Sequence, residues 1–159
     1  LGHAAVRDGL CVSGSNAYGA QARGGAARSE VVISKVPIAF PHVLRADLLV
    51  AMSQSAYEVF VDRTARPGGL VLYDASLVET RPEEGLLQVP VPATETAVSE
   101  LRNKQVANIV ILGAAAARSG VVSRQALEGA VREQVPERFR EPNLKALARG
   151  WEMALPDRA

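Results

Sequence analysis

Residues 47–74, DLLVAMSQSAYEVFVDRTARPGGLVLYD, contain two apolar segments separated by a more polar one. The first, Asp47–Ser53, is a nearly unbroken apolar run of strand length, which is typical of a strand covered on both faces in a parallel sheet. The last, Leu70–Asp74, is again apolar and rich in β-forming residues. We therefore expect two parallel strands, the first of them central in the sheet.

The segment between these two strands is predicted to be a short helix. Gln54–Thr64 repeats apolar residues at Ala56, Val59 and Phe60, which places one apolar stripe on that helix. Arg66-Pro67-Gly68-Gly69 ends it. Strand, helix and strand then form a βαβ unit whose crossover is expected to be right-handed.

The rest of the chain adds strands and helices on either side of this unit. Helix starts are indicated by Asn103, Ser123 and Asn143, and a helix end by Gly120. The helix from Lys104 is apolar almost all round, so we expect it to be buried on more than one side. The expected helices are Leu1–Arg7, Thr94–Leu101, Lys104–Arg118, one from Ser123 to Pro136 and one from Asn143; the expected strands are Gly9–Ser13, Ser29–Lys35 and Leu86–Val91.

These elements predict an α/β fold with an open, mostly parallel sheet and helices on both faces. A chain of 159 residues, 48% hydrophobic and 22% charged, fits a single domain over residues 1–159. Its net charge of +1 offers no basic field for nucleic acid. The longest apolar run, Ile109–Ala117, is too short to span a bilayer, and no secretory signal opens the chain, so we expect a cytoplasmic protein without a membrane segment.

Few residues fit a catalytic or metal-binding constellation. Cys11 is the only cysteine, so the chain can form no internal disulfide and cannot by itself ligate an iron–sulfur cluster, which needs about four thiolates. His3 and His42 have no metal-ligand spacing to each other or to Cys11, and there is no Gly-x-Ser-x-Gly elbow. Any redox metal is therefore expected on a partner.

A glycine-rich stretch, Asn16–Ser29, has the composition of a recognition loop. Gly19, Gly24 and Gly25 permit positive φ and a close approach of the backbone to a ligand or another chain. Arg23 offers a planar, permanently charged group beside exposed backbone N–H groups, which suits phosphate or carboxylate. The alternative is a long turn with solvated arginines, and composition alone leaves the two open.

Several other polar positions are candidates for ligand contact. Ser53-Gln54 and Ser76 follow strands at their carboxyl ends, where open α/β sheets bind ligands, although Ser53 also suits an ordinary helix cap. Asn108 lies in the most apolar helix, so its amide needs a partner, either a neighbouring backbone group or a ligand or second subunit. Trp151 lies on an apolar stripe and is expected in the core or an interface.

The glycine-rich stretch also resembles a known family. Tyr18-Gly19-x-x-Ala22-Arg23-Gly24-Gly25-Ala26-x-Arg28-Ser29-Glu30-Val31-Val32-Ile33-Ser34 is similar to the gamma subunit, or gamma domain, of 2-oxoacid:ferredoxin oxidoreductases. The Ala-Arg-Gly-Gly-Ala-x-Arg-Ser form looks most like members that use 2-oxoglutarate, and Gln21 stands where many relatives have Glu. The likeness covers nearly the whole chain, continuing through Asp47-Leu48-Leu49-Val50-Ala51-Met52-Ser53-Gln54, Pro67-Gly68-Gly69, Val91-Pro92-Ala93-Thr94, Val106-Ala107-Asn108-Ile109-Val110-x-Leu112-Gly113-Ala114 and Asn143-Leu144-Lys145-Ala146-Leu147.

The resemblance implies a subunit of an enzyme that converts a 2-oxoacid and coenzyme A to an acyl-coenzyme A and carbon dioxide, passing electrons to ferredoxin. It implies that thiamine diphosphate, magnesium and 4Fe-4S clusters are held by alpha and beta subunits and, where present, a ferredoxin-like delta subunit, so that this chain alone is inactive. The alternative is a free-standing α/β module that binds a nucleotide or acyl-coenzyme A. Candidate contacts for the cosubstrate coenzyme A are Tyr18, Gly19, Arg23, Gly24, Gly25, Ser53, Gln54 and Asn108. For Arg23 and the Gly24-Gly25 backbone, contact with a partner subunit is the alternative.

The start of the chain differs from the family pattern. In the family, a strand and a Gly-x-Gly-Gly-Gln-Gly turn precede the helix whose last part corresponds to Leu1–Arg7. We therefore expect the native product to be longer, and this 1–159 gamma-type domain to lack its first strand and that turn.

Overall fold

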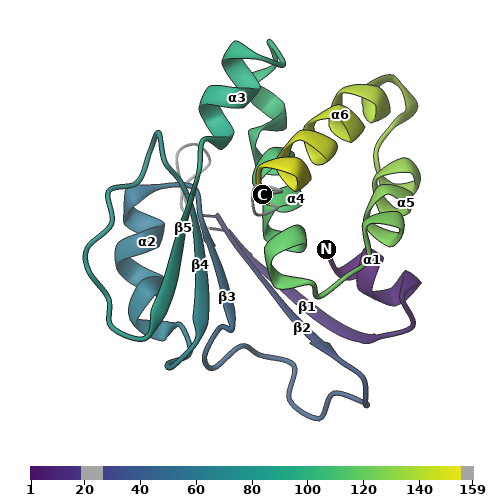
Figure 1. The fold of residues 1–159 in the computed structure, drawn as a ribbon. Coiled ribbons are helices and arrows are strands. Elements are labelled where there is room, and N and C mark those ends of the chain that lie inside the picture. The colour runs from purple at the N-terminus through teal and green to yellow at the C-terminus, as the bar shows by residue number, and fades with distance from the viewer. Residues whose placement is uncertain (19–26, 155–159) are drawn as a thin grey trace, which may run out of the picture.

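The structure is a computed structural model that describes residues 1–18 and 27–154 (Figure 1). The strands lie in the first part of the chain, with α2 between β3 and β4, and the last part is helical; η1 and η2 are short 3₁₀ helices that adjoin α2 and α4. In chain order the elements are α1 (Gly2–Arg7), β1 (Cys11–Tyr18), β2 (Ala27–Ser34), β3 (Leu48–Ala51), α2 (Gln54–Phe60), η1 (Val61–Arg63), β4 (Gly69–Asp74), β5 (Leu86–Val91), α3 (Ala93–Ser99), η2 (Lys104–Val106), α4 (Ala107–Ser119), α5 (Arg124–Gln134) and α6 (Glu137–Ala154).

The centre of the molecule is a parallel three-stranded sheet with the strand order β3-β4-β5. Leu48 of β3 is paired with Leu70 of β4, and Gly69 of β4 with Leu86 of β5, so all three strands run in one direction. In the described residues β4 is therefore the central strand, and the central position predicted for the 47–53 strand is wrong. An apolar run indicates that both faces of a strand are covered. The place of the strand in the sheet depends instead on which of its edges are paired with other strands.

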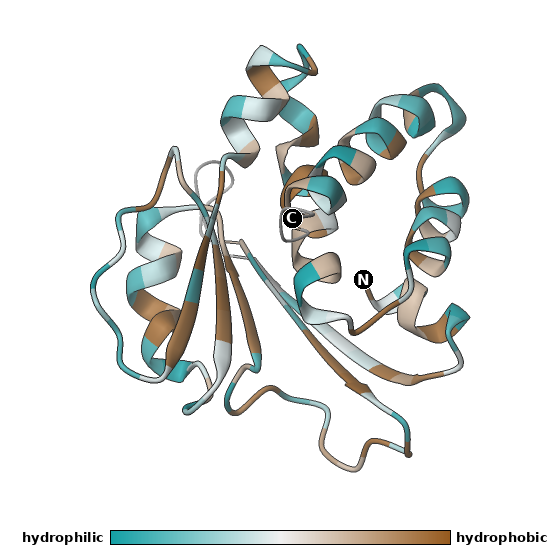
Figure 2. Cartoon of the chain, in the orientation of Figure 1, coloured by the Kyte–Doolittle hydropathy of each residue, from teal (hydrophilic) through white to brown (hydrophobic). Residues whose placement is uncertain are grey.

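Helices cover both faces of this sheet, as the sequence predicts. Figure 1 shows α2 on one face and α4 on the other. On the α2 side, Tyr57 and Val61 pack with Ala51, Val71 and Val78. On the α4 side, the apolar cluster contains Leu72, Val91, Val106, Val110 and Ile111. Figure 2 shows the corresponding concentration of apolar residues along β3, β4 and β5. The expected α/β fold with a βαβ unit is confirmed.

The buried face of α2 differs from the predicted stripe. Val59 is 54% exposed, whereas Tyr57 is 1% exposed and Val61 fully buried. Tyr57 can face the interior because its hydroxyl donates a hydrogen bond of 2.8 Å to Gln88 Oε1 and accepts one of 3.2 Å from the Arg81 N–H. A tyrosine that finds partners for its polar end can be buried as fully as an aliphatic residue, which the apolar pattern alone does not reveal.

β1 and β2 form a separate antiparallel hairpin. Its register runs from Cys11 opposite Ser34 to Tyr18 opposite Ala27. The expected strands 9–13 and 29–35 are therefore too short, because residues 16–18 and 27–28 of the predicted loop belong to the ladder. Next to α1, Val12 and Ile33 pack in a cluster with Ala4 and Ala5 of that helix.

Most of the helix ends that were predicted from capping residues are confirmed. Ser123 accepts a hydrogen bond of 3.1 Å from the Ala126 N–H at the start of α5, and Gly120 ends α4 with φ of 63°. Asn103 accepts from the Gln105 N–H, so it caps η2, which leads directly into α4. Side-chain caps and left-handed glycines are local signals that tertiary contacts rarely override.

The last helix starts earlier than predicted. α6 begins at Glu137 and continues through Pro142, and the side chain of Asn143 donates 2.7 Å to the Phe139 carbonyl inside the helix instead of capping its start. The prediction took Asn143 as the start, but an asparagine can also lie inside a helix when its side chain bonds a carbonyl one turn back. Farther along the helix, α6 packs on α4, where Gly113 and Gly150 let the two backbones approach closely.

No helix among the described residues is both long and apolar enough to cross a lipid bilayer.

Candidate functional site

The carboxyl ends of the three parallel strands lie at one edge of the sheet. α2 starts here after β3, and α3 starts here after β5. Figure 1 shows that α4 also begins at this end of the molecule, and that β1 ends and β2 starts on the same side. The fold thus brings Ser53, Ser76, Asn108 and the Tyr18 end of the hairpin to one end of the molecule, where α/β sheets bind ligands.

The buried side chain of Asp74 links two elements at the carboxyl edge of the sheet. Its side chain is fully buried, and its carboxylate accepts hydrogen bonds of 3.0 Å from the N–H of Ser76, 3.0 Å from the N–H of Thr94 and 2.6 Å from the Thr94 hydroxyl. These bonds join the end of β4 to the first turn of α3. Asp74 was not among the candidate residues predicted from the sequence. Its position as an acidic residue at the end of an apolar strand could have indicated it.

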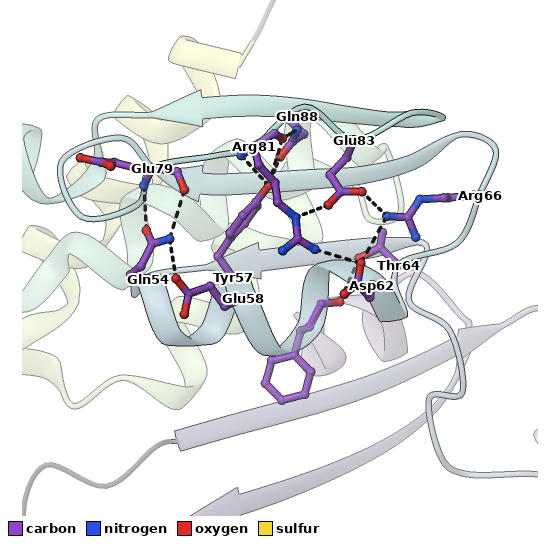
Figure 3. A network of polar contacts seen from close by, with 11 residues as sticks. Gln54, Tyr57, Glu58, Asp62, Thr64, Arg66, Glu79, Arg81, Glu83 and Gln88 are labelled. Carbon is purple, nitrogen blue, oxygen red and sulfur yellow. Dashed lines mark hydrogen bonds and ion pairs between the residues drawn. The ribbon is translucent and has the colours of Figure 1, made fainter.

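Ser53 and Gln54 are engaged in structural contacts at the start of α2. Ser53 Oγ accepts a hydrogen bond of 3.2 Å from the Ala56 N–H, which makes it the helix cap. Gln54 Oε1 accepts 2.8 Å from the Glu79 N–H, while Nε2 donates 3.2 Å to the Glu79 carbonyl (Figure 3). The Gln54 amide therefore pairs with residue 79 as a neighbouring strand would, and holds the β4–β5 connection against α2.

A network of ion pairs continues from this contact along α2 (Figure 3). Arg81 and Arg66 both bind Glu83, the latter at 2.7 Å, and Arg81 also lies 3.1 Å from Asp62. The hydrogen bond from Arg81, supported by that from Arg66, lowers the pKa of Glu83 against the opposing effect of desolvation. The network holds the β4–β5 connection, residues 75–85, over α2. We therefore assign these charged residues a structural role.

The glycine-rich stretch is described only at its two ends. Tyr18 and Ala27 are paired at the end of the hairpin ladder. Gly19, Arg23, Gly24 and Gly25 lie outside the described residues. In the view of Figure 1, β1 ends and β2 begins on the side of the molecule where β3–β5 have their carboxyl ends.

Asn108 lies in the first turn of α4 and is exposed. The expectation that its amide is buried in this helix is therefore wrong, whereas contact with a ligand or a second subunit stays a prediction. α4 is buried on more than one side, as predicted, with Val110, Ile111 and Ala114 in the core. An almost wholly apolar helix still has a narrow outward stripe, and position 108 falls on it.

The two histidines and Trp151 have environments that are ordinary for surface and core residues. His42 stacks edge-on against Phe40, with ring centroids 5.5 Å apart, and His3 is exposed. Trp151 packs against the cluster around Leu127 and Leu147, as expected for a core position. Over the described ranges, no three His, Cys, Asp or Glu side chains gather as a metal site would require.

Two hollows flank the first half of α6. One is lined by Glu128, Arg132, Arg140 and Lys145 among others, and the second by Asn103, Arg138 and Glu141 among others. Their charges are mixed in sign, which favours no class of ligand.

Comparison with solved structures places the fold among known enzymes. The chain is similar to the gamma subunit of a keto/oxoacid ferredoxin oxidoreductase from Geobacter sulfurreducens, with a TM-score of 0.83 and 38% identity, covering 96% of this chain and 86% of that one. It is also similar to a 2-oxoglutarate:ferredoxin oxidoreductase from Magnetococcus marinus solved with 2-oxoglutarate, coenzyme A and succinyl-CoA bound, with a TM-score of 0.81 and 26% identity. That match covers 96% of this chain and 27% of the Magnetococcus chain.

Sequence comparison narrows the class to one family. The 2-oxoglutarate synthase subunit KorC of Methanocaldococcus jannaschii is 43% identical over 142 residues, which cover 88% of this chain and 75% of that protein. The sequence profile of the pyruvate ferredoxin/flavodoxin oxidoreductase family matches residues 1–153. The chain belongs to this family, and the resemblance drawn from its motifs is confirmed. Its homologues are subunits of oxidoreductase complexes.

Proposed function

We propose that this chain is the gamma subunit of a thiamine-diphosphate-dependent 2-oxoacid:ferredoxin oxidoreductase that acts in the cytoplasm. The complex would decarboxylate a 2-oxoacid oxidatively with coenzyme A, giving acyl-coenzyme A and carbon dioxide and passing the electrons to ferredoxin. The observation that supports this most is the similarity to KorC over 88% of the chain. The same similarity favours 2-oxoglutarate as the 2-oxoacid.

In this proposal the redox groups belong to the partners. The chain has one cysteine, whereas a cluster needs about four thiolates. Thiamine diphosphate, magnesium and the 4Fe-4S clusters are accordingly assigned to the alpha, beta and delta subunits. The part left for this chain is to complete the assembly and to help bind coenzyme A.

Support for the coenzyme A role comes from the composition of the glycine-rich stretch and from its described flanks. Tyr18 and Ala27 are paired at the end of the hairpin that lies on the same side of the molecule as the carboxyl ends of β3–β5. Arg23 would contact a phosphate of coenzyme A, with the backbone of Gly19, Gly24 and Gly25 beside it, because a guanidinium and free N–H groups together suit such an anion. The backbone around Ser53-Gln54 and the exposed amide of Asn108 lie at the same end and complete the proposed contact surface.

Reconstitution tests the assembly. The isolated chain, given thiamine diphosphate, magnesium, coenzyme A and 2-oxoglutarate, should reduce no viologen dye, and addition of the partner subunits should restore 2-oxoacid-dependent reduction. Turnover by the chain alone would contradict the gamma-subunit role. A correctly assembled but inactive complex would contradict the proposed reaction, and a chain isolated from its source without partners would favour a free-standing binding module.

The coenzyme A contact has a separate test. Arg23→Ala in the assembled complex should weaken coenzyme A binding by roughly 1.5–3 kcal/mol, the range for a lost charge-assisted contact. Arg23→Lys should restore only part of it, because lysine keeps the charge but not the fork. Normal assembly with unchanged affinity for coenzyme A would rule out the phosphate contact.

A further inference from the structure

The loop between β2 and β3, residues 35–46, exposes several apolar side chains. It leads into the amino end of β3, at the end of the molecule opposite the carboxyl edge of the sheet (Figure 1). Val36 is 64% exposed, Phe40 54% and Leu44 75%, and Figure 2 shows apolar residues at several points along the loop. A single exposed apolar residue is ordinary on a protein surface, but several on one short segment mark a contact with another molecule.

The rest of this chain does little to cover the loop. Residues 37–45 form no helix or strand, and among the described residues no backbone hydrogen bond reaches them. None of the large apolar residues of the loop belongs to the apolar clusters found within residues 1–18 and 27–154. These residues are Val36, Ile38, Phe40, Val43 and Leu44. The exposed apolar side chains of the loop therefore contribute little to the core of this chain.

Phe40 is the aromatic residue of this surface. Its ring lies edge-on against the ring of His42, with the centroids 5.5 Å apart and the ring planes at 72°. Both residues are exposed, so the two rings pack on each other and not in the core. Aromatic side chains are enriched in the centres of protein interfaces, where a few of them supply most of the binding energy.

The charges of the loop all have one sign. Lys35 and Arg45 lie at its two ends, and it contains no Asp or Glu. Both side chains belong to exposed residues, and no ion pair joins either of them to another residue in the described part of the chain. The complementary surface is therefore an apolar patch bordered by carboxylates.

The comparisons indicate which kind of molecule carries such a patch. The Geobacter relative is a gamma subunit on a chain of its own, 86% of which is covered by the match. In the Magnetococcus enzyme the same fold is only 27% of the chain, so most of that polypeptide lies outside the shared domain. A domain that occurs both alone and within a longer chain needs a surface that holds the separate partner where the covalent connection is missing.

We propose that residues 35–46 dock on the partner subunit that corresponds to the remainder of the Magnetococcus chain. Phe40 is the central contact, with Val36 and Leu44 beside it, and Lys35 and Arg45 face carboxylates at the rim. This inference rests on the proposed function, in which the chain works only with partner subunits.

Binding of the purified chain to the complex assembled without it tests the proposal. Phe40→Ser should raise the Kd by at least about tenfold, the effect of removing one central interface residue. The double variant Lys35→Glu, Arg45→Glu should slow association and remove most of the salt dependence of binding, because rim charges act mainly on the association rate. All variants should unfold at the wild-type denaturant concentration, since the changed side chains are exposed.

Val59 supplies a matched control. It lies on α2 and is 54% exposed, as Phe40 is. Val59→Ser should therefore bind the partner subunits with the wild-type Kd. If Val59→Ser weakens binding as much as Phe40→Ser does, the loop is not the specific contact and the inference is overturned.

The remaining outcomes separate this inference from the function on which it rests. If the wild-type chain does not bind the partner subunits, the proposed function fails and the inference fails with it. If the wild type binds and Phe40→Ser binds equally well, only the docking role of the loop is overturned. Dimerisation of the isolated chain, or its sedimentation with vesicles of anionic lipid, would also overturn that role if Phe40→Ser abolished it while leaving the affinity for the partner subunits unchanged.

Discussion

The three-stranded sheet and the β1–β2 hairpin differ in composition and in the way they are held: β3, β4 and β5 are mostly apolar, whereas β1 and β2 carry many polar residues. The sheet is covered by helices on both faces, and its β4–β5 connection is tied down by Gln54, Tyr57 and the Glu83 ion pairs. The hairpin has one apolar anchor, near α1, and exposed side chains at its other end. The rigid region therefore serves as a scaffold, and the lightly held region carries the candidate recognition stretch. The predictions that follow test how the scaffold is held.

The largest effect is expected where α4 and α6 meet. A Cβ atom on Gly150 would lie 1.8 Å from the carbonyl oxygen of Val110, so Gly150→Ala must push the helices apart. We expect a loss of about 3 kcal/mol in the free energy of unfolding, measured by denaturant titration of the purified chain. Gly129→Ala is the matched control, because its Cβ would meet only the flexible end of Arg7. Equal effects of the two changes would contradict the close approach of α4 and α6.

Removal of the buried Asp74 carboxylate should come next. Asp74→Ala leaves the N–H groups of Ser76 and Thr94 without their acceptor, which should cost about 2–3 kcal/mol of unfolding free energy. Asp74→Asn keeps one side-chain oxygen as an acceptor and should lose less. If both variants unfold at the wild-type denaturant concentration, Asp74 does not join β4 to α3 as described.

The Tyr57 hydroxyl should have a moderate effect. Tyr57→Phe removes its hydrogen bond to Gln88 and the one it accepts from Arg81, at a cost of about 1 kcal/mol. Tyr73→Phe is the control on β4, since no hydrogen bond of its hydroxyl is found within residues 1–18 and 27–154. Local hydrogen exchange of residues 79–81 should quicken in Tyr57→Phe alone. Unchanged exchange there would show that the hydroxyl does not hold the connection.

The smallest expected effect is on the acid side of the stability curve. The pKa of Glu83 is lowered in the folded chain, chiefly by the hydrogen bond from Arg81. Its contribution to stability is therefore present above the ordinary pKa of glutamate and is lost as the pH falls through the lowered value. Thermal unfolding at a series of acid pH values should show a shallower decline for Glu83→Gln than for the wild type. Identical slopes would mean that Glu83 is not charged and paired in this way.

The elements that the sequence predicts well are those set by local signals. Ser123 and Gly120 mark helix ends with side-chain or left-handed caps, and the structure confirms both. The βαβ alternation follows from segment lengths and apolar runs alone. The family resemblance could be recognised because the glycine-rich motif is long and has its glycines and arginines in a fixed order.

The misplaced features depend on contacts distant in sequence. Tyr57 is buried because residues 81 and 88 bind its hydroxyl, and β3 lies at the end of the sheet because of how three separate strands pair. Asn108 is exposed because one narrow stripe of an apolar helix faces outward. Of the candidate site, the sequence identifies the carboxyl edge of the strands through Ser53 and Ser76, but it does not reveal Asp74, whose role appears only when β4 and α3 are placed together.

The hydrogen bonds of the Gln54 amide make the contact between α2 and the β4–β5 connection sensitive to deamidation. Its oxygen accepts from the Glu79 N–H, and its nitrogen donates to the Glu79 carbonyl and, at 3.1 Å, to Glu58. Deamidation would replace that nitrogen with a carboxylate oxygen, which has no proton to donate and would face a carbonyl oxygen and a second carboxylate. A change that leaves the shape of the side chain almost untouched would therefore keep the bond from the Glu79 N–H but turn the contact with the Glu79 carbonyl from attractive to repulsive.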